Sequence, residues 1–415
     1  MINVMHKVLL TIIVAAFHHY AQAQRHEIYD DNIVSLLVVA DNNWMSLPII
    51  ELKSNQRIYI DFDDLTHVYH RYAYKIEHCE SDWQPSTQLF ESDYIGGFAN
   101  GNLIEDISES INTNTLYTHY SFSIPNRNCF LKMSGNYRII IYDDNDDERI
   151  VATAYFMVLD KKMGVDISYT TNTDVGINSE YQQINMQLKY GQERVTNPLE
   201  QIKTVVLQNQ QWHDARTNVK PQYIMPDGLR WEHCLDYIFN AGNEYHKFEI
   251  LDPTHPTMGI DQIIWDGDNY QVYPFINEPT NNYIYDEDAN GSFLIRNSEN
   301  YEIDRTSEYV IVNFELKTPY ISDGSIYING VWTNDCFLPK YKMRYDNNSK
   351  SYKAQVMLKQ GYYSYQYLLV DNENNIKRLP SEGNFYQTEN SYQALVYFRP
   401  IGGRTDLLVG YSDIR

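Results

Sequence analysis

The sequence predicts an all-β protein that contains three consecutive immunoglobulin-like β-sandwich domains. Apolar and polar residues alternate with period two in several stretches, as in half-buried strands, whereas helical periodicity does not recur. Asp-Gly and Asn-Gly pairs, which favour tight turns, separate these stretches. Short strands with frequent turns are typical of packed antiparallel sheets.

Residues 1–23 have the pattern of a secretory signal peptide. Lys7 supplies the positive charge, an apolar run covers residues 8–17, and small residues precede the expected cleavage between Ala23 and Gln24. The run is too short to span a bilayer and no cysteine follows it, so we expect an exported, soluble chain without a membrane or lipid anchor.

Three units are expected in the rest of the chain, because a single core rarely grows beyond roughly 250–300 residues. The first, 24–160, contains the alternating stretch 57–62 and ends in a hairpin of residues 137–142 and 149–159. The second, 161–305, contains the alternating stretch 183–190 and a strand at 203–208. The third, 306–415, contains two further alternating stretches, 310–316 and 352–358.

Composition restricts the class of partner. The formal net charge of −22 repels phosphate backbones and anionic lipid surfaces, which argues against nucleic acid and against direct membrane insertion. The chain has 37 tyrosines against 15 phenylalanines. Because a tyrosine ring packs while its hydroxyl stays hydrated, this excess favours half-exposed sheet surfaces and protein interfaces.

Candidate metal ligands are weak. The acidic loop 143–148 lacks the glycine and the distal glutamate of an EF-hand loop, so a solvated hairpin tip is favoured. His67 and His70 have no third ligand nearby. His78 and Cys79 are neighbours in an expected strand, so their side chains point to opposite faces. We therefore expect no metal site and no cofactor.

Catalytic motifs are also missing from the sequence. It contains no HExxH, Gly-x-Ser-x-Gly or Gly-rich phosphate loop, and no pair of acids stands out. We expect no catalytic residues, no enzymatic activity and no small-molecule substrate. The four cysteines at 79, 129, 234 and 336 lie far apart; disulfides in any of three pairings are possible, but free, mostly buried thiols are favoured.

Two tryptophans occupy informative positions. Trp83 follows a strand and a polar turn, which predicts that its ring caps a sandwich core. In the third unit, residues 325–332, 352–358 and 361–367 resemble a glycogen-binding or isoamylase N-terminal sandwich. Such modules stack exposed tryptophans on sugar rings, which makes a carbohydrate-binding accessory protein the alternative function, although Trp332 lies earlier than the tryptophan usual in such modules.

A second resemblance covers nearly the whole mature chain. Its motifs are Tyr74–Trp83, Tyr94–Phe98, Asn112–Tyr120, Ser134–Tyr142, Val195–Pro198, Lys203–Trp212, Lys220–Pro221, Gly242–Tyr245, Leu395–Pro400 and Asp406–Tyr411. In this order they resemble the plug protein of the type IX secretion system. The resemblance implies a non-enzymatic periplasmic protein, peripherally associated with the outer membrane. It would dock on the periplasmic mouth of the large outer-membrane β-barrel translocon and close its pore when idle. No residues that contact the translocon are singled out by the sequence.

Overall fold

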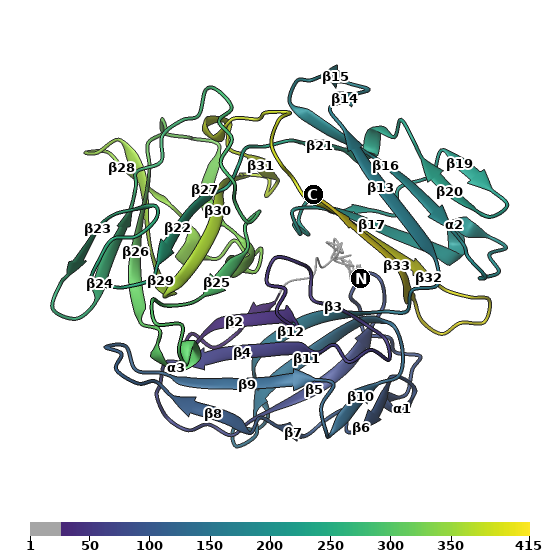
Figure 1. Ribbon diagram of the computed structural model, residues 1–415, viewed down its shortest axis with the longest axis horizontal. Helices are drawn as coiled ribbons and strands as arrows, with labels where there is room; N and C mark the ends of the chain where they lie inside the picture. The colour runs from purple at the N-terminus through teal and green to yellow at the C-terminus, as the bar shows by residue number, and fades with distance from the viewer. Residues whose placement is uncertain (1–25) are drawn as a thin grey trace, which may run out of the picture.

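The computed structural model describes residues 26–415, so the predicted signal peptide and its cleavage between Ala23 and Gln24 lie outside the described residues. The described chain is all-β, as predicted, and its sheets pack as three β-sandwiches. Figure 1 shows the three sandwiches arranged as a triangle, with the first below, the third at upper left and the middle one at upper right.

The first sandwich packs two sheets around one core. One sheet consists of β1 (Glu27–Ile28), β3 (Ile49–Glu51), β5 (Tyr72–Cys79), β7 (Asn102–Leu103), β11 (Gly135–Asp143) and β12 (Arg149–Leu159). Its order is β1-β12-β11-β5-β7, with β3 parallel to β12. The other consists of β2 (Ile33–Ala40), β4 (Ile58–Asp64), β8 (Asp106–Glu109) and β9 (Thr118–Ile124), in the order β2-β4-β9-β8. A short helix α1 (Glu91–Tyr94) precedes the ribbon of β6 (Ile95–Gly97) and β10 (Cys129–Leu131).

The middle sandwich also has two sheets. The first contains β13 (Gly164–Thr170), β16 (Tyr181–Lys189), β19 (Tyr223–Met225), β20 (Gly228–Trp231) and β21 (Ile238–Asn240). The second contains β17 (Ile202–Gln208), β18 (Arg216–Thr217), β32 (Tyr392–Phe398) and β33 (Leu407–Ile414), in the order β18-β17-β32-β33. Smaller elements are β14 (Asn172–Thr173), β15 (Gly176–Ile177), α2 (Pro198–Gln201) and η1 (Leu235–Tyr237).

The third sandwich lies between the two segments of the middle one in sequence. One sheet groups β22 (His246–Ile250), β25 (Phe293–Ile295), β27 (Gly324–Asn329) and β31 (Ile376–Arg378) around β30 (Gly361–Asp371). The other is β23 (Ile260–Trp265), β24 (Tyr270–Pro274), β26 (Tyr309–Leu316), β29 (Ser351–Lys359) and β28 (Arg344–Asp346), in that order. Short helices are α3 (Ile303–Thr306), η2 (Val331–Thr333), η3 (Pro339–Tyr341) and η4 (Pro380–Glu382).

Strand pairing places the boundaries elsewhere than the expected division at 305/306. β32 and β33 return to the middle sandwich, where β32 pairs with β17, while β22 to β25 pair within the third sandwich. The reason is physical: alternation shows that a segment is a strand, but the partner of that strand depends on contacts nearly two hundred residues away.

The predicted alternating stretches form the cores. In β4, Ile58, Ile60 and Phe62 are buried, and Ile184, Met186 and Leu188 of β16 are buried in the middle sandwich. The predicted hairpin is confirmed, because β11 pairs with β12 and the polar, mostly acidic segment 144–148 forms its turn.

Tyrosines are distributed differently from the expectation. Most of the largest fully buried side chains are tyrosines, among them Tyr137, Tyr237 and Tyr397. Several of their hydroxyls are anchored inside the protein, as in the bond from Tyr137 to the carbonyl of Met133 (2.7 Å). Tyrosine therefore serves as a core residue at many positions, while others, such as Tyr69 and Tyr320, are exposed as expected.

Three of the cysteines match the prediction of buried free thiols: Cys79, Cys129 and Cys234. Burial raises the pKa of Cys79 to about 12, which keeps it protonated and unreactive. Cys336 is half-buried, with its Sγ 4.0 Å from the carbonyl oxygen of His26.

Candidate interaction surfaces and the junctions behind them

An apolar cluster joins the first and middle sandwiches. It consists of the buried residues Leu47, Trp83, Tyr155, Met157, Leu159, Val205, Leu207, Trp212, Leu395, Tyr397 and Leu408. The Trp83 ring meets the rings of Tyr155 and Trp212 edge-on, each with ring centroids 5.5 Å apart. The prediction that Trp83 caps a sandwich core is therefore wrong: a turn with φ of 66° directs its ring into the junction between two sandwiches.

Beside this cluster, the buried residue Asp406 is the centre of a polar network. Its carboxylate accepts hydrogen bonds from Ser81 Oγ (2.8 Å), Lys203 Nζ (2.8 Å) and Arg399 Nε (2.9 Å). Burial alone would raise the pKa of Asp406, but these donors lower it to about 2. Ser81 belongs to the first sandwich and Lys203 and Arg399 to the middle one, so the network fixes their relative position.

A second buried network joins the first and third sandwiches. Asp63, 1% exposed, accepts hydrogen bonds from Lys359 Nζ (2.7 Å) and Tyr309 Oη (2.5 Å), and its other oxygen lies 2.7 Å from His119 Nδ1. Lys359 Nζ also lies 4.2 Å from the centre of the Tyr117 ring. Every member of this network is buried, and the charges of Asp63 and Lys359 are paired with each other.

The charged groups in this junction shift one another's pKa values. Burial alone would raise the pKa of Asp63, but the charge of Lys359 and the contact with His119 hold it below its ordinary value. Burial alone would lower the pKa of His119, but Asp63 raises it above its ordinary value. Asp61 lies 3.8 Å from His119, but burial is the largest influence on its pKa and raises it to about 6.

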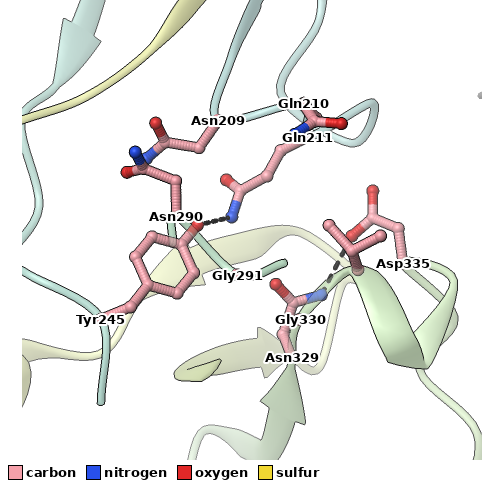
Figure 2. Close-up of a pocket in the computed structure, with 10 residues that line it drawn as sticks. Asn209, Gln210, Gln211, Tyr245, Asn290, Gly291, Asn329, Gly330 and Asp335 are labelled. Carbon is pink, nitrogen blue, oxygen red and sulfur yellow. Dashed lines mark hydrogen bonds between the residues drawn. The ribbon is translucent and has the colours of Figure 1, made fainter. Parts of the chain in front are cut away.

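The middle and third sandwiches meet at a small polar pocket (Figure 2). Gln211 donates to Tyr245 Oη and Asn329 donates to Asp335 Oδ1 (3.1 Å), as the dashed lines in Figure 2 show. Asp335 also lies 2.8 Å from His213 Nδ1 across the junction. The space is about 30 Å³, which is the size of an ordered water, so the pocket is part of the junction.

The outer end of the first sandwich exposes aromatic side chains. Phe90, Phe98 and Phe130 are exposed by 73%, 69% and 57%. Phe130 of β10 pairs with Gly96 of β6, and Phe98, which follows β6 directly, donates its amide to the carbonyl of Asn128 (3.0 Å), so both residues belong to the same ribbon. We call these three residues the aromatic patch. Exposed aromatic groups of this kind mark interaction surfaces.

Two glycines shape the patch. A Cβ on Gly96 would lie 2.1 Å from Cζ of Phe130, so the absence of a side chain leaves room for that ring. Gly97 has φ of 91°, and a Cβ there would lie 2.1 Å from the carbonyl oxygen of Asn128. The Gly-Gly-Phe sequence at 96–98 was a signal for this surface, but which face of the ribbon is exposed depends on its packing.

The candidate metal and catalytic residues of the sequence do not assemble into a site. His67 Nδ1 lies 3.1 Å from the carbonyl of Tyr117, and His70 Nδ1 lies 3.2 Å from Asp143. His78 is buried, with Nδ1 2.9 Å from Ser86 Oγ, and burial lowers its pKa to about 4. Over residues 26–415, no group of three or more His, Cys, Asp or Glu side chains is placed to hold a metal ion.

Trp332 is a core residue. Its ring is 7% exposed, stacks on Phe314 at 6.3 Å, and donates from Nε1 to the carbonyl of Ser364 (3.1 Å). A ring in this position cannot stack on a sugar, so the residue on which the carbohydrate-binding alternative depended does not offer a binding face. Within the same described part of the chain, no helix has both the length and the apolar character needed to cross a bilayer.

Comparison with known proteins supplies the family. The family description "Type 9 secretion system plug protein 1st domain" matches residues 33–160, which correspond to the first sandwich. A crystal structure of a hypothetical protein from Parabacteroides merdae ATCC 43184 superposes with a TM-score of 0.91 at 35% sequence identity, covering 95% of this chain and 100% of that one. No curated protein sequence matches the chain.

A further solved structure, trypsin-activated alpha-2-macroglobulin from Escherichia coli, covers 94% of this chain and 24% of its own, at 9% identity and a TM-score of 0.15. At that score the likeness carries no argument. The family match and the full-length similarity agree with the motifs that the sequence carries in order. The chain belongs to the type 9 secretion system plug protein family.

Proposed function

We propose that the chain is a non-enzymatic periplasmic plug, which docks on the periplasmic mouth of the outer-membrane β-barrel translocon and closes its pore when no substrate passes. The observation that carries this proposal is the match of residues 33–160 to the plug family's first domain. A pore wide enough for folded cargo would leak solutes unless a solid body filled its mouth.

The junctions support a role that needs a rigid body. The first sandwich is joined to the middle one by the apolar cluster around Trp83 and to the third by the buried Asp63–Lys359 pair. Both junctions consist of fully buried groups, which move relative to one another only at high free-energy cost. A body held in this way can close an opening without deforming.

The aromatic patch is our candidate for the surface that docks. It lies inside the segment that the family description matches, and Figure 1 places its elements α1, β6 and β10 at the outer end of the first sandwich. A standard interface buries roughly 800 Å² on each partner, with a few aromatic anchors at its centre. Phe90, Phe98 and Phe130 supply such anchors.

The test has two parts. In a strain without this protein, the outer membrane should become more permeable to a large hydrophilic antibiotic while the translocon remains present, as checked by immunoblot. In detergent extracts of outer membrane, the tagged protein should capture the translocon. Unchanged permeability with the translocon in place, together with no capture, would refute the proposal.

A further inference from the structure

The edge of one sheet in the first sandwich is open. In the order β2-β4-β9-β8, the strand β8 is terminal. A cavity of about 560 Å³ lies along it, lined by Tyr69, Thr118, Arg305 and the consecutive residues 107–111. Successive side chains of a strand point to opposite faces of the sheet. A cavity that contacts five consecutive residues therefore lies along the edge of the strand and not on one face.

The hydrogen-bonding pattern shows which backbone groups of β8 face the cavity. The amide of Ser110 donates to the carbonyl of Tyr117 (2.9 Å), so this pair is of the hydrogen-bonded type. The register then makes Ser108 and His119 the next such pair, and the groups of Ile107 and Glu109 point away from β9. The outer edge therefore presents an N–H and a C=O at each of two positions.

The third sandwich already continues this edge. The amide of Ile111, the next outward-facing position, donates to the carbonyl of Arg305 (2.8 Å). The open groups of Ile107 and Glu109 are thus continuous with an existing contact between two sandwiches. A strand added here would extend a line of hydrogen bonds that the protein has begun.

The walls indicate the chemistry of the occupant. Tyr69 is 67% exposed and Ile111 is 37% exposed, so an apolar side chain of a bound segment can cover them. Glu109 is exposed at the same edge, and Arg305 is compensated by Glu302 at 3.0 Å. Together with the net charge of −22, this favours a segment that carries a basic residue beside apolar ones.

We propose that this edge binds an extended segment of the translocon as an added β-strand, with backbone bonds to Ile107 and Glu109, an apolar side chain over Tyr69 and Ile111, and a basic side chain beside Glu109. The proposal rests on the proposed function and specifies how the partner is held. Backbone pairing of this kind provides affinity, while the side-chain positions provide selectivity.

The first test removes the outward donors. In the variant Ile107→Pro/Glu109→Pro, both outward N–H groups are lost, at edge positions where proline is tolerated. Affinity for the purified translocon, measured by biolayer interferometry, should fall by about tenfold, the effect of losing two ordinary hydrogen bonds. Ile107→Ala/Glu109→Ala, which loses the same two side chains but keeps both backbone donors, serves as the matched control and should bind more tightly than the proline variant.

The second test does not depend on a variant that folds. Amide hydrogen exchange of the wild-type protein should slow at Ile107 and Glu109 when the translocon is added, whereas Ser108, already paired with β9, should change little. Unaltered exchange at Ile107 and Glu109 in a complex that does form would overturn this inference and leave the plug function standing. Absence of any complex with the wild-type protein would overturn both.

Discussion

Lys359 is a buried lysine, 2% exposed, whose charge is tolerated only because Asp63, the carbonyl of Asp304 and the Tyr117 ring surround it. Taking two charges out of water is expensive, and the attraction between them offsets that cost only when both are present. The pair joins β29 of the third sandwich to β4 of the first. Its two residues are 296 positions apart in the sequence, so no local pattern could reveal it.

Removing one partner of this pair should destabilise the protein strongly. Lys359→Met leaves Asp63 buried without its cation and should lower the free energy of unfolding by about 3–5 kcal/mol. Urea unfolding followed by tryptophan fluorescence measures this change. The double variant Lys359→Met/Asp63→Asn should recover part of the loss. A double variant as unstable as the single one would show that packing, and not charge, dominates the junction.

His119 should make the stability of this junction depend on pH. Its pKa in the folded protein is raised, so its contribution is complete below its ordinary value and is lost as the pH rises through the folded value. The stability advantage of wild type over His119→Gln should therefore be larger at about pH 5.5 than at about pH 8.5.

The comparison with His119→Gln is needed because other groups also make the stability depend on pH. Burial lowers the pKa of His78 to about 4, so the contribution of His78 to stability rises with pH, opposite to that of His119. Asp61, whose pKa burial raises to about 6, acts in the same direction as His119. Urea unfolding of both proteins at the two pH values gives the difference. An advantage that is equal at the two values would contradict the role assigned to His119.

A variant of Trp332 tests whether this residue belongs to the core. Trp332→Ala should cost about 3–5 kcal/mol of folding free energy, since a packed ring and one hydrogen bond are lost. Binding to the translocon should be unchanged. Trp265→Ala, in a position 46% exposed on β23, is the matched control and should lie within about 0.5 kcal/mol of wild type. A Trp332→Ala protein of normal stability that loses affinity for a glucan would instead restore the carbohydrate-binding alternative.

At the scale of elements, the sequence predicted individual strands and one hairpin, but not the pairing of strands that lie far apart in the sequence. Alternation identified β4, β16, β26 and β29, because each buries one face and leaves the other partly exposed. β12 is different: Phe156 and Val158 face the core of the first sandwich, while Tyr155, Met157 and Leu159 face the junction. A strand buried on both faces reads as a continuous apolar run, and this was the available signal for the junction.

The ribbon of β6 and β10 should determine docking without affecting stability. Phe98→Ala/Phe130→Ala removes two exposed rings, so the melting temperature should stay close to that of wild type. If the rings are interface anchors, affinity for the translocon should weaken by at least about 2 kcal/mol. Biolayer interferometry with purified translocon measures this effect.

The control for this variant is Tyr223→Ala/Ile224→Ala on β19 of the middle sandwich. These two large hydrophobic side chains are also exposed, by 51% and 56%, and they lie far in sequence from the patch. They should leave affinity unchanged. Equal losses in both variants would assign docking to exposed apolar groups in general, and a loss only in the control would move the interface to the middle sandwich.

At the scale of the whole molecule, the chain path itself links the sandwiches. The third sandwich is inserted between β21 and β32 of the middle one, so two connections cross between them. β17 buries Val206 in the core of the middle sandwich and Val205 and Leu207 against the first. One strand therefore belongs to both a core and a junction, which couples the folding of the two bodies.

This coupling predicts that the whole chain unfolds as one unit. Three sandwiches joined by short linkers would melt separately, but here separation exposes Trp212, Leu395 and Tyr397 to water, and burial of such side chains contributes roughly 25 cal/mol per Å² of apolar surface. Calorimetry of the protein should give one transition with equal calorimetric and van't Hoff enthalpies. The variant Leu207→Asp, which places an unpaired charge in the junction, should lower the melting temperature and separate the transition of the first sandwich from the rest. Ile224→Asp, at an exposed position of β19, is the control and should retain one transition. Several independent transitions in the unaltered protein would show that the sandwiches do not form one cooperative body, and would remove the rigidity on which pore closure depends.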